Sequence, residues 1–336
     1  MNHVVKKFGV LLSLIVLVIS LVSCGDRTSN STNRTSNSTE RTNNSAAPTS
    51  SEPSVITPDI TKKETNYPVT ITGSDGVSVT LEKQPKKVVS GGPNITEILY
   101  QLGVEDTIIA RTDYCDFPSE VTSIPSIGTL MEPNIEAIVA SEPDLVIASA
   151  HFNEENRNKL AQLGIPVLAL FEEHDLTGIY EVITLLGQAM NVNQEAATTV
   201  EDMKREITDI ETKLEGIEAK TVYYVVGYGE YGDFTAGGDT FVHEIIEAAG
   251  GQNIASDVNG WGYNLETLLE KDPEYILLGI GEKEAFINAP NYKELTAVKQ
   301  NKVFEIDRNL IDRQTYRNAQ GVLAIAKVLH SDIFAE

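Results

Sequence analysis

Two stretches of the chain, Pro133-Asn-Ile-Glu-Ala-Ile138 and Tyr263-Asn-Leu-Glu-Thr-Leu268, share one pattern. In both, an Asn stands two residues before the Glu, a Pro stands seven residues after it, and an apolar run follows that Pro. Such a repeat indicates one supersecondary unit used twice, and it predicts two similar lobes. Because small ligands usually bind in clefts, we expect a ligand between the two lobes.

The regions around the repeat alternate between short apolar strands and helices, which predicts parallel sheets covered on both faces. In the first half we expect a β-hairpin of Tyr67–Thr72 and Val77–Glu82, strands at Lys87–Ser90, Asp106–Arg111, Leu145–Ser149 and Val167–Leu170, and helices at Ile95–Leu102, around Glu136 and at Glu154–Leu163. In the second half we expect strands at Thr221–Val226, Asn253–Ala255, Tyr275–Leu278 and Val303–Ile306, and helices at Phe241–Ala249, around Glu266, at Glu284–Val298 and at Asn318–Phe334.

A long helical region separates the two series. A helix at Leu176–Met190 precedes one at Gln194–Leu214, whose apolar residues recur every three or four positions as in an amphipathic helix. The predicted fold class is therefore α/β, with two Rossmann-like lobes whose parallel sheets are joined by one long α-helix. We place the N-terminal lobe at residues 63–175, the helical linker at 176–218 and the C-terminal lobe at 219–336.

The first residues of the chain predict export and lipid attachment. Two lysines precede an apolar run that ends in Leu21-Val-Ser-Cys24, and a small residue before a Cys at this place resembles a bacterial lipobox. We expect residues 1–23 to be a lipoprotein signal peptide and Cys24 to carry the lipid, with an ordinary membrane anchor as the alternative. Residues 24–62 are rich in Ser, Thr and Asn and have few large apolar side chains, so we expect a disordered tether.

The composition excludes several classes of function. A formal net charge of −23 argues against nucleic acid as a partner, because phosphates are bound by cationic side chains. With Cys24 assigned to the lipid, Cys115 has no partner for an internal disulfide. The five His residues do not occur in HxxH or HExxH spacing, so the sequence predicts no metal site.

Four short segments carry a resemblance to a known family. They are Ser90-Gly-Gly-Pro-Asn-Ile-Thr-Glu-Ile-Leu99, Asp113-Tyr-Cys-Asp-Phe-Pro118, Glu132-Pro-Asn-Ile-Glu-Ala-Ile138 and Glu142-Pro-Asp-Leu-Val-Ile147. In this order and spacing, and with two α/β lobes joined by a long helix, they resemble the class III solute-binding proteins of ABC importers, which carry ferric siderophores, haem and cobalamin. The second segment looks most like the cobalamin-binding branch, and the third is common in the siderophore-binding branch. The resemblance covers about residues 67–336.

The resemblance implies a binding protein and not an enzyme. It implies a position outside the cytoplasm, the permease and ATPase subunits of an importer as partners, no intrinsic cofactor, and a metal chelate as ligand; we expect a monomer. It also implies that Glu136 and Glu266, one in each lobe, dock onto arginines of the permease, where charge complementarity sets encounter rate and register. Two other interpretations remain open. Each Glu could stand in the first turn of a helix because the helix dipole favours a negative charge there, or the two could be the acid and base of a glycosidase.

The ligand is expected at loops that follow the carboxyl ends of the strands. The predicted ligand-binding residues are Asn94, Tyr114, Phe117, Met131, Phe152, Tyr228, Trp261, Tyr263, Arg313 and Arg317. Their aromatic faces suit a broad, flat ligand, and the two arginines suit an anionic iron complex. The alternatives are packing roles for the tyrosines and ion pairs of the arginines with Asp307 or Asp312.

Three further functions are weighed against this one. A haem-binding member of the same family, with iron held by His151, His174 or Tyr114, has no matched second ligand in the sequence. A lipid-anchored α/β enzyme requires a Cys cluster or a convergent set of titratable groups, and the sequence shows neither. An adhesion lipoprotein is the third. The long linking helix also predicts that the lobes move only modestly against each other.

Overall fold

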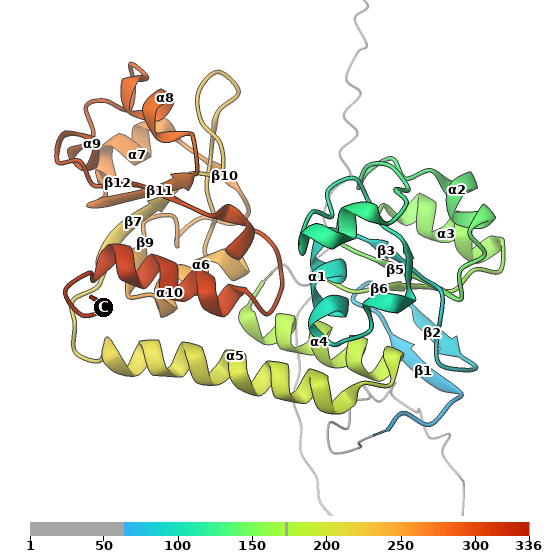
Figure 1. The fold of residues 1–336 in the computed structure, drawn as a ribbon. Helices are drawn as coiled ribbons and strands as arrows, with labels where there is room; N and C mark the ends of the chain where they lie inside the picture. The colour runs from blue at the N-terminus through green and yellow to red at the C-terminus, as the bar shows by residue number, and fades with distance from the viewer. Residues whose placement is uncertain (1–63, 172–173, 336) are drawn as a thin grey trace, which may run out of the picture. The chain divides into compact units, whose positions relative to one another are not determined.

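A computed structural model describes residues 64–171 and 174–335, all of which belong to the compact unit Ile56–Glu336. Figure 1 gives the arrangement of its helices and strands. The predicted signal peptide, Cys24 and the predicted tether lie outside the described residues. Within the described part of the chain, no helix is long and apolar enough to cross a membrane.

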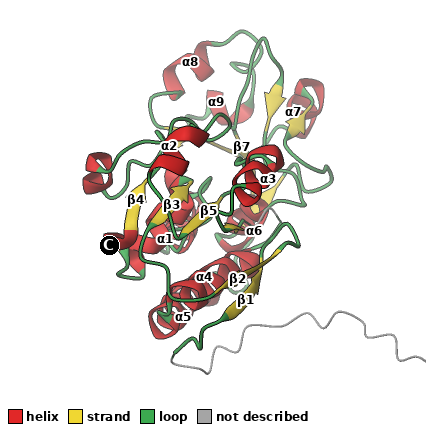
Figure 2. Ribbon diagram, turned by 90° about the vertical axis from the view of Figure 1, so that its right-hand side faces the viewer, coloured by secondary structure: helices red, strands yellow, loops and turns green. Residues whose placement is uncertain are grey.

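The N-terminal lobe, which we define as the elements from β1 to β6, is built on a four-stranded parallel sheet. Its elements are β1 (Val69–Thr72), β2 (Ser78–Leu81), β3 (Val88–Gly91), α1 (Pro93–Gln101), β4 (Ile108–Ala110), α2 (Ile135–Ala140), β5 (Leu145–Ala148), α3 (Glu154–Gln162) and β6 (Val167–Ala169). The strand order is β4-β3-β5-β6, and every residue of β3 and β5 is buried. The predicted hairpin forms as the antiparallel pair β1–β2, and β1 contacts α4 (Figure 2).

The C-terminal lobe, which we define as the elements from β7 to α10, repeats this topology. Its elements are β7 (Lys220–Tyr224), β8 (Asp233–Phe234), α6 (Phe241–Ala248), β9 (Gly251–Asn253), β10 (Gly262–Tyr263), α7 (Leu265–Lys271), β11 (Tyr275–Gly279), α8 (Lys283–Asn288), α9 (Thr296–Lys299), β12 (Val303–Ile306) and α10 (Asn318–Leu329). The sheet order is β12-β11-β7-β9 and all its pairings are parallel. Numbered within each lobe, both sheets run 2-1-3-4, so the repeat seen in the sequence extends to the whole sheet.

The repeated Asn-Glu segments have the same local structure. Asn134 caps α2 by accepting a hydrogen bond from the Ala137 N–H (3.0 Å), and Asn264 caps α7 by accepting one from the Glu266 N–H (2.8 Å). An uncapped helix start would leave these N–H groups without partners. After each helix, the residue before the Pro of the repeat has a positive φ, which is 48° at Glu142 and 39° at Asp272. The sequence pattern therefore specifies a capped helix, a left-handed turn and a strand twice.

Two helices, α4 (Leu176–Met190) and α5 (Asn193–Lys213), connect the lobes. They contribute to one buried apolar cluster whose other members come from both lobes. Helix α5 packs on α4 and on α10, as Figure 1 shows along its length. The two connecting helices approach closely where a side chain at Gly187 would collide with Ala196, at 2.4 Å between Cβ positions. The predicted long amphipathic helix is thus a packed part of the core.

Two predicted helices in the C-terminal lobe differ from those found. The stretch Glu284–Val298 is not one helix, because α8 ends at Asn288, Ala289 is extended, and Pro290 cannot continue a helix. The last helix ends at Leu329 and not at Phe334. There the His330 ring lies 3.0 Å from the carbonyl oxygen of Gly250.

Candidate functional site

A pocket of about 410 Å³ has walls from both lobes. The lining residues are Pro93, Asn94, Tyr114, Leu130, Ser149, Ala150, His151, Asp312, Arg313 and Gln314. They belong to the start of α1, to loops after β4 and β5, and to the loop between β12 and α10. These loops follow the carboxyl ends of parallel strands, which is where open α/β sheets bind their ligands. We call this pocket the cleft pocket.

Beside the cleft pocket, ion pairs cross from one lobe to the other. The Arg313 Nη1 atom lies 2.6 Å from Glu97 Oε1 and 2.7 Å from Asp116 Oδ1. Arg317 donates a hydrogen bond to the other oxygen of Glu97, at 3.2 Å. The side chain of Glu97 is fully buried. We call these four residues the cross-lobe clasp.

Local structure holds Glu97, Arg313 and Arg317 in place. Glu97 lies on the side of α1 opposite Ile95 and Ile98, which pack into the core, so the helix carries its carboxylate toward the arginines of the other lobe. The buried amide of Asn318 donates a hydrogen bond to the carbonyl of Arg313 (2.8 Å) and so fixes the loop before α10. The guanidinium of Arg317 lies 4.0 Å from the centroid of the Phe117 ring, a cation–π contact.

Burial and charge pairing act in opposite directions on the pKa values of the clasp, and burial prevails only at Glu97. It raises the pKa of Glu97 above the ordinary Glu value, while the hydrogen bond and charge of Arg313 and the nearby Arg317 act in the opposite direction. Burial by itself would lower the pKa of Arg313, but Asp116 and Glu97 raise it overall. The carboxylates thus stabilise the charged form of Arg313, and that arginine in turn favours ionised Glu97.

The structure brings three of the predicted ligand-binding residues, Asn94, Tyr114 and Arg313, to the cleft pocket. Met131 is next in sequence to the lining residue Leu130 and is 64% exposed. Phe152 has no exposed surface, belongs to the core cluster of β3 and β5, and is not among the residues that line the cleft pocket, contrary to the expected ligand contact. Phe117 and Arg317 are engaged with each other, and Arg317 also lies 3.8 Å from Asp307, as one alternative anticipated.

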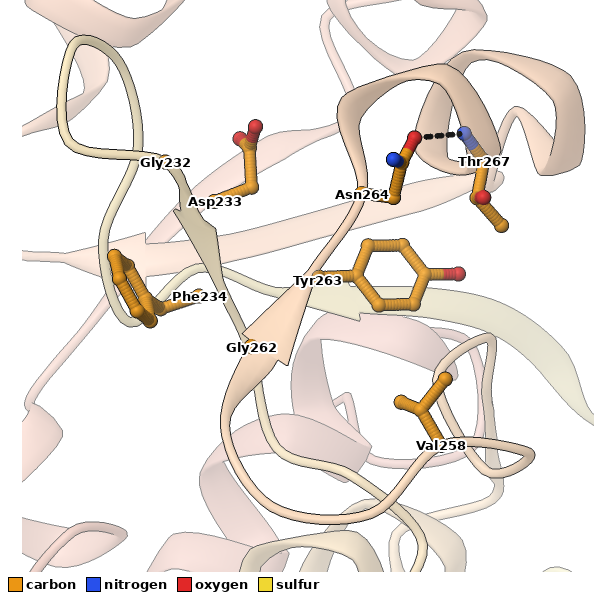
Figure 3. Close-up of a pocket in the computed structure, with 8 residues that line it drawn as sticks. All are labelled: Gly232, Asp233, Phe234, Val258, Gly262, Tyr263, Asn264 and Thr267. Carbon is orange, nitrogen blue, oxygen red and sulfur yellow. Dashed lines mark hydrogen bonds between the residues drawn. The ribbon is translucent and has the colours of Figure 1, made fainter. Parts of the chain in front are cut away.

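The remaining candidates lie in the C-terminal lobe away from the lining of the cleft pocket. Tyr263 lines a second pocket of about 380 Å³, with Gly232, Asp233, Phe234, Val258, Gly262, Asn264 and Thr267, as Figure 3 shows. Tyr228 packs edge-on against Phe286 and Tyr292. Trp261 is 41% exposed, and its carbonyl accepts a hydrogen bond from the Thr235 N–H. Sequence order alone did not separate these residues from the cleft.

Glu97 and Asp116 are the site residues that sequence reasoning missed. No local signal pointed to Glu97, because helical periodicity places it opposite the apolar stripe of Ile95, Ile98 and Leu99, on the side expected to be polar. Nothing in the sequence indicated that this carboxylate meets arginines more than 200 positions later, at Arg313 and Arg317. Among the described residues, no group of three or more His, Cys, Asp or Glu is placed to hold a metal ion.

The two repeated glutamates are both exposed. Glu136 and Glu266 each occupy the first turn of a short helix, α2 and α7, directly after its Asn cap. From the cap onward, the pattern of exposed and buried residues is the same in both helices. Each lobe therefore presents one carboxylate to solvent from an equivalent position.

This fold and cleft define a class of protein: an α/β binding protein with two lobes. The model of the periplasmic binding protein family matches residues 88–310, and the chain belongs to that family. It is 31% identical over 278 residues to the ABC transporter substrate-binding lipoprotein YvrC of Bacillus subtilis, covering 80% of this chain and 88% of that one. The protein is therefore an extracytoplasmic substrate-binding protein of an ABC importer and not an enzyme.

Other relatives differ in the ligands that their names give. A cobalamin-binding protein of Halobacterium salinarum is 25% identical over 281 residues, covering 79% of this chain and 75% of that one. The structure of a Fe³⁺-hydroxamate transport protein from Saccharomonospora viridis superposes with a TM-score of 0.66 at 25% identity, covering 79% of this chain and all of that one. These comparisons confirm the predicted family and fold class.

We predict that Arg313→Met destabilises the protein in a pH-dependent way. The substitution leaves buried Glu97 with one arginine fewer and so raises its pKa further. At pH 7.5 we expect a loss of about 1.5–3 kcal/mol in the free energy of unfolding, because buried Glu97 loses a charged hydrogen-bonding partner. As the pH falls through the folded-state pKa, Glu97 binds a proton in both proteins, and the difference should shrink.

Urea denaturation at pH 7.5 and at pH 5 measures this difference. Arg205→Met is the matched control, because Arg205 pairs with Asp202 on the exposed face of α5 and should cost less than about 1 kcal/mol. An Arg313→Met loss that is equal at both pH values would show that Arg313 acts by packing and not through ionised Glu97.

Proposed function

We propose that this substrate-binding protein captures cobalamin or a related corrinoid between its lobes and delivers it to its permease. The observation that carries the proposal is the cleft pocket, which both lobes line at the carboxyl ends of their strands. The relative from Halobacterium salinarum named as a cobalamin-binding protein supports this ligand class. So does Tyr114-Cys-Asp-Phe-Pro118, which resembles the cobalamin-binding branch of the family.

The side chains at the cleft suit a large, mostly neutral ring system. The Tyr114 side chain is 54% exposed and supplies an aromatic face with a polar tip. Asn94 and Ser149 line the same pocket and offer hydrogen-bonding groups for the amides at the edge of a corrin. A ferric hydroxamate is the second candidate, because the Saccharomonospora viridis transport protein is equally similar in sequence.

Isothermal titration of the whole chain in detergent, with cyanocobalamin, a ferric hydroxamate and haemin, tests the ligand class. We expect saturable binding of cyanocobalamin and a loss of about fivefold or more in affinity for Tyr114→Ala, because an aromatic contact contributes roughly 1 kcal/mol. Tyr231→Ala is the control, since Tyr231 is 89% exposed and lies outside the lining of both pockets. Binding of the hydroxamate or haemin in place of cyanocobalamin would replace the proposed ligand.

We further propose that Glu136 and Glu266 dock onto arginines of the permease, with each monomer presenting one carboxylate from each lobe. Their exposure and their equivalent positions after the Asn caps support this role. Two charges on separate lobes suit recognition of a partner by register, because complementary charges guide encounter more than they add affinity.

Replacing both Glu136 and Glu266 with Ala should abolish ligand uptake by cells that depend on this protein, while ligand affinity in solution stays unchanged. The matched control replaces Glu154 and Glu284, which occupy the first turns of α3 and α8, one in each lobe. If the control pair loses uptake to the same extent, the docking role is wrong and a general effect of acidic helix starts explains the result.

Finally, we propose that Cys24 carries the lipid that holds the protein at the outer face of the membrane. The lipobox-like Leu21-Val-Ser-Cys24 supports this, as does the name of the relative YvrC, a lipoprotein. Cys24→Ser should move the protein from the membrane fraction to the medium or periplasm, with no lipid mass on the chain. Retention of Cys24→Ser in the membrane would favour the alternative of an uncleaved anchor.

A further inference from the structure

The guanidinium of Arg313 brings a positive charge to the cleft pocket, and two carboxylates of the protein already pair with it. Among the described residues that line it, Arg313 is the one Lys or Arg. A single nitrogen of its guanidinium, Nη1, contacts Glu97 at 2.6 Å and Asp116 at 2.7 Å. Only 15% of the Arg313 side chain is exposed. An anionic ligand that enters the cleft therefore meets an arginine whose charge is compensated.

The surrounding charges reinforce this compensation. The guanidinium groups of Arg313 and Arg317 face three carboxylates, those of Glu97, Asp116 and Asp307. Asp312, which also lines the pocket, accepts a hydrogen bond from Arg308 (2.9 Å) and one from the Tyr224 hydroxyl. Counted together, the clasp and Asp307 carry one more negative charge than positive charge, so they do not attract an anion.

An anionic ligand gains little binding free energy by displacing these carboxylates from Arg313. Asp116 is the accessible partner, with 59% of its side chain exposed, whereas Glu97 is fully buried. A ligand anion that replaces Asp116 exchanges one ion pair for another, and it remains close to the carboxylate that it displaced. A neutral ligand has no such exchange to make, because it can bind beside the clasp with the ion pairs intact.

We propose that Glu97 and Asp116 act as specificity determinants that mask Arg313 and so select neutral ligands against anionic metal complexes. This inference rests on the proposed function of the cleft pocket as the ligand site. It narrows the ligand class to neutral complexes. A cobalamin or a neutral hydroxamate complex can bind without pairing with Arg313, whereas a ferric tris-catecholate would need that charge. From the sequence, Arg313 was expected to bind an anionic iron complex. Here it has a different role, as the partner of Glu97 and Asp116.

The substitution Asp116→Asn tests the mask with little change of shape. It removes one negative charge and one ionic partner of Arg313, at a position exposed enough to tolerate the change. By isothermal titration of the whole chain in detergent, we expect affinity for a ferric tris-catecholate to rise at least tenfold over the unsubstituted protein. Affinity for cyanocobalamin should change less than threefold. Asp209→Asn, which makes the same charge change on the exposed face of α5, should change neither affinity.

The outcomes separate this inference from the proposed function. If Asp116→Asn gains tris-catecholate binding that an added Arg313→Met removes, the mask is supported, whether or not cyanocobalamin binds. If cyanocobalamin binds but Asp116→Asn gains nothing, the mask is wrong and the corrinoid function stands. If the unsubstituted protein binds the tris-catecholate tightly, Arg313 is available to anions and the mask is overturned. A gain that Asp209→Asn shares would reflect net charge alone and would also overturn it.

Discussion

Every strand in the two four-stranded sheets is parallel to its neighbours, and this constrains where the protein can bind anything. Parallel sheets are covered by helices on both faces, as the complete burial of β3 and β5 shows. The faces of the sheets are therefore buried in the core, and the loops at the strand ends remain available for binding a ligand. The 2-1-3-4 order in both lobes gives each of them the same set of loops, and the cleft pocket is lined from both sets.

The cross-lobe clasp shows how an acidic protein compensates the charge of an arginine in the cleft between its lobes. Glu97 lies on the side of α1 opposite its core residues Ile95 and Ile98, and its burial is acceptable because two arginines of the other lobe supply partners. The same contacts join the lobes and compensate the positive charge of Arg313. The connecting helices α4 and α5 contribute a second, apolar link, since they share one core cluster with both lobes.

Local patterns in the sequence predicted most of the fold. The helix Leu176–Met190 has the predicted bounds, and the predicted helices around Glu136 and Glu266 both form, each capped by the Asn of the repeat. The prediction of one helix over Glu284–Val298 was wrong because it did not take account of Pro290, which cannot continue a helix, and α8 ends at Asn288. Of the residues predicted to bind ligand, Asn94, Tyr114 and Arg313 follow strands and line the cleft pocket, whereas Phe152 also follows a strand but is buried in the core.

The sequence by itself determined the two-lobed α/β architecture, because helix caps, strand patterns and the repeat depend on residues close together in the chain. It also determined that the protein is acidic and that its two exposed glutamates are equivalent. Only the tertiary structure decided what Arg313 does. Its partners Glu97 and Asp116 are about two hundred residues away in sequence, and no local pattern records a contact that forms when two separate lobes meet.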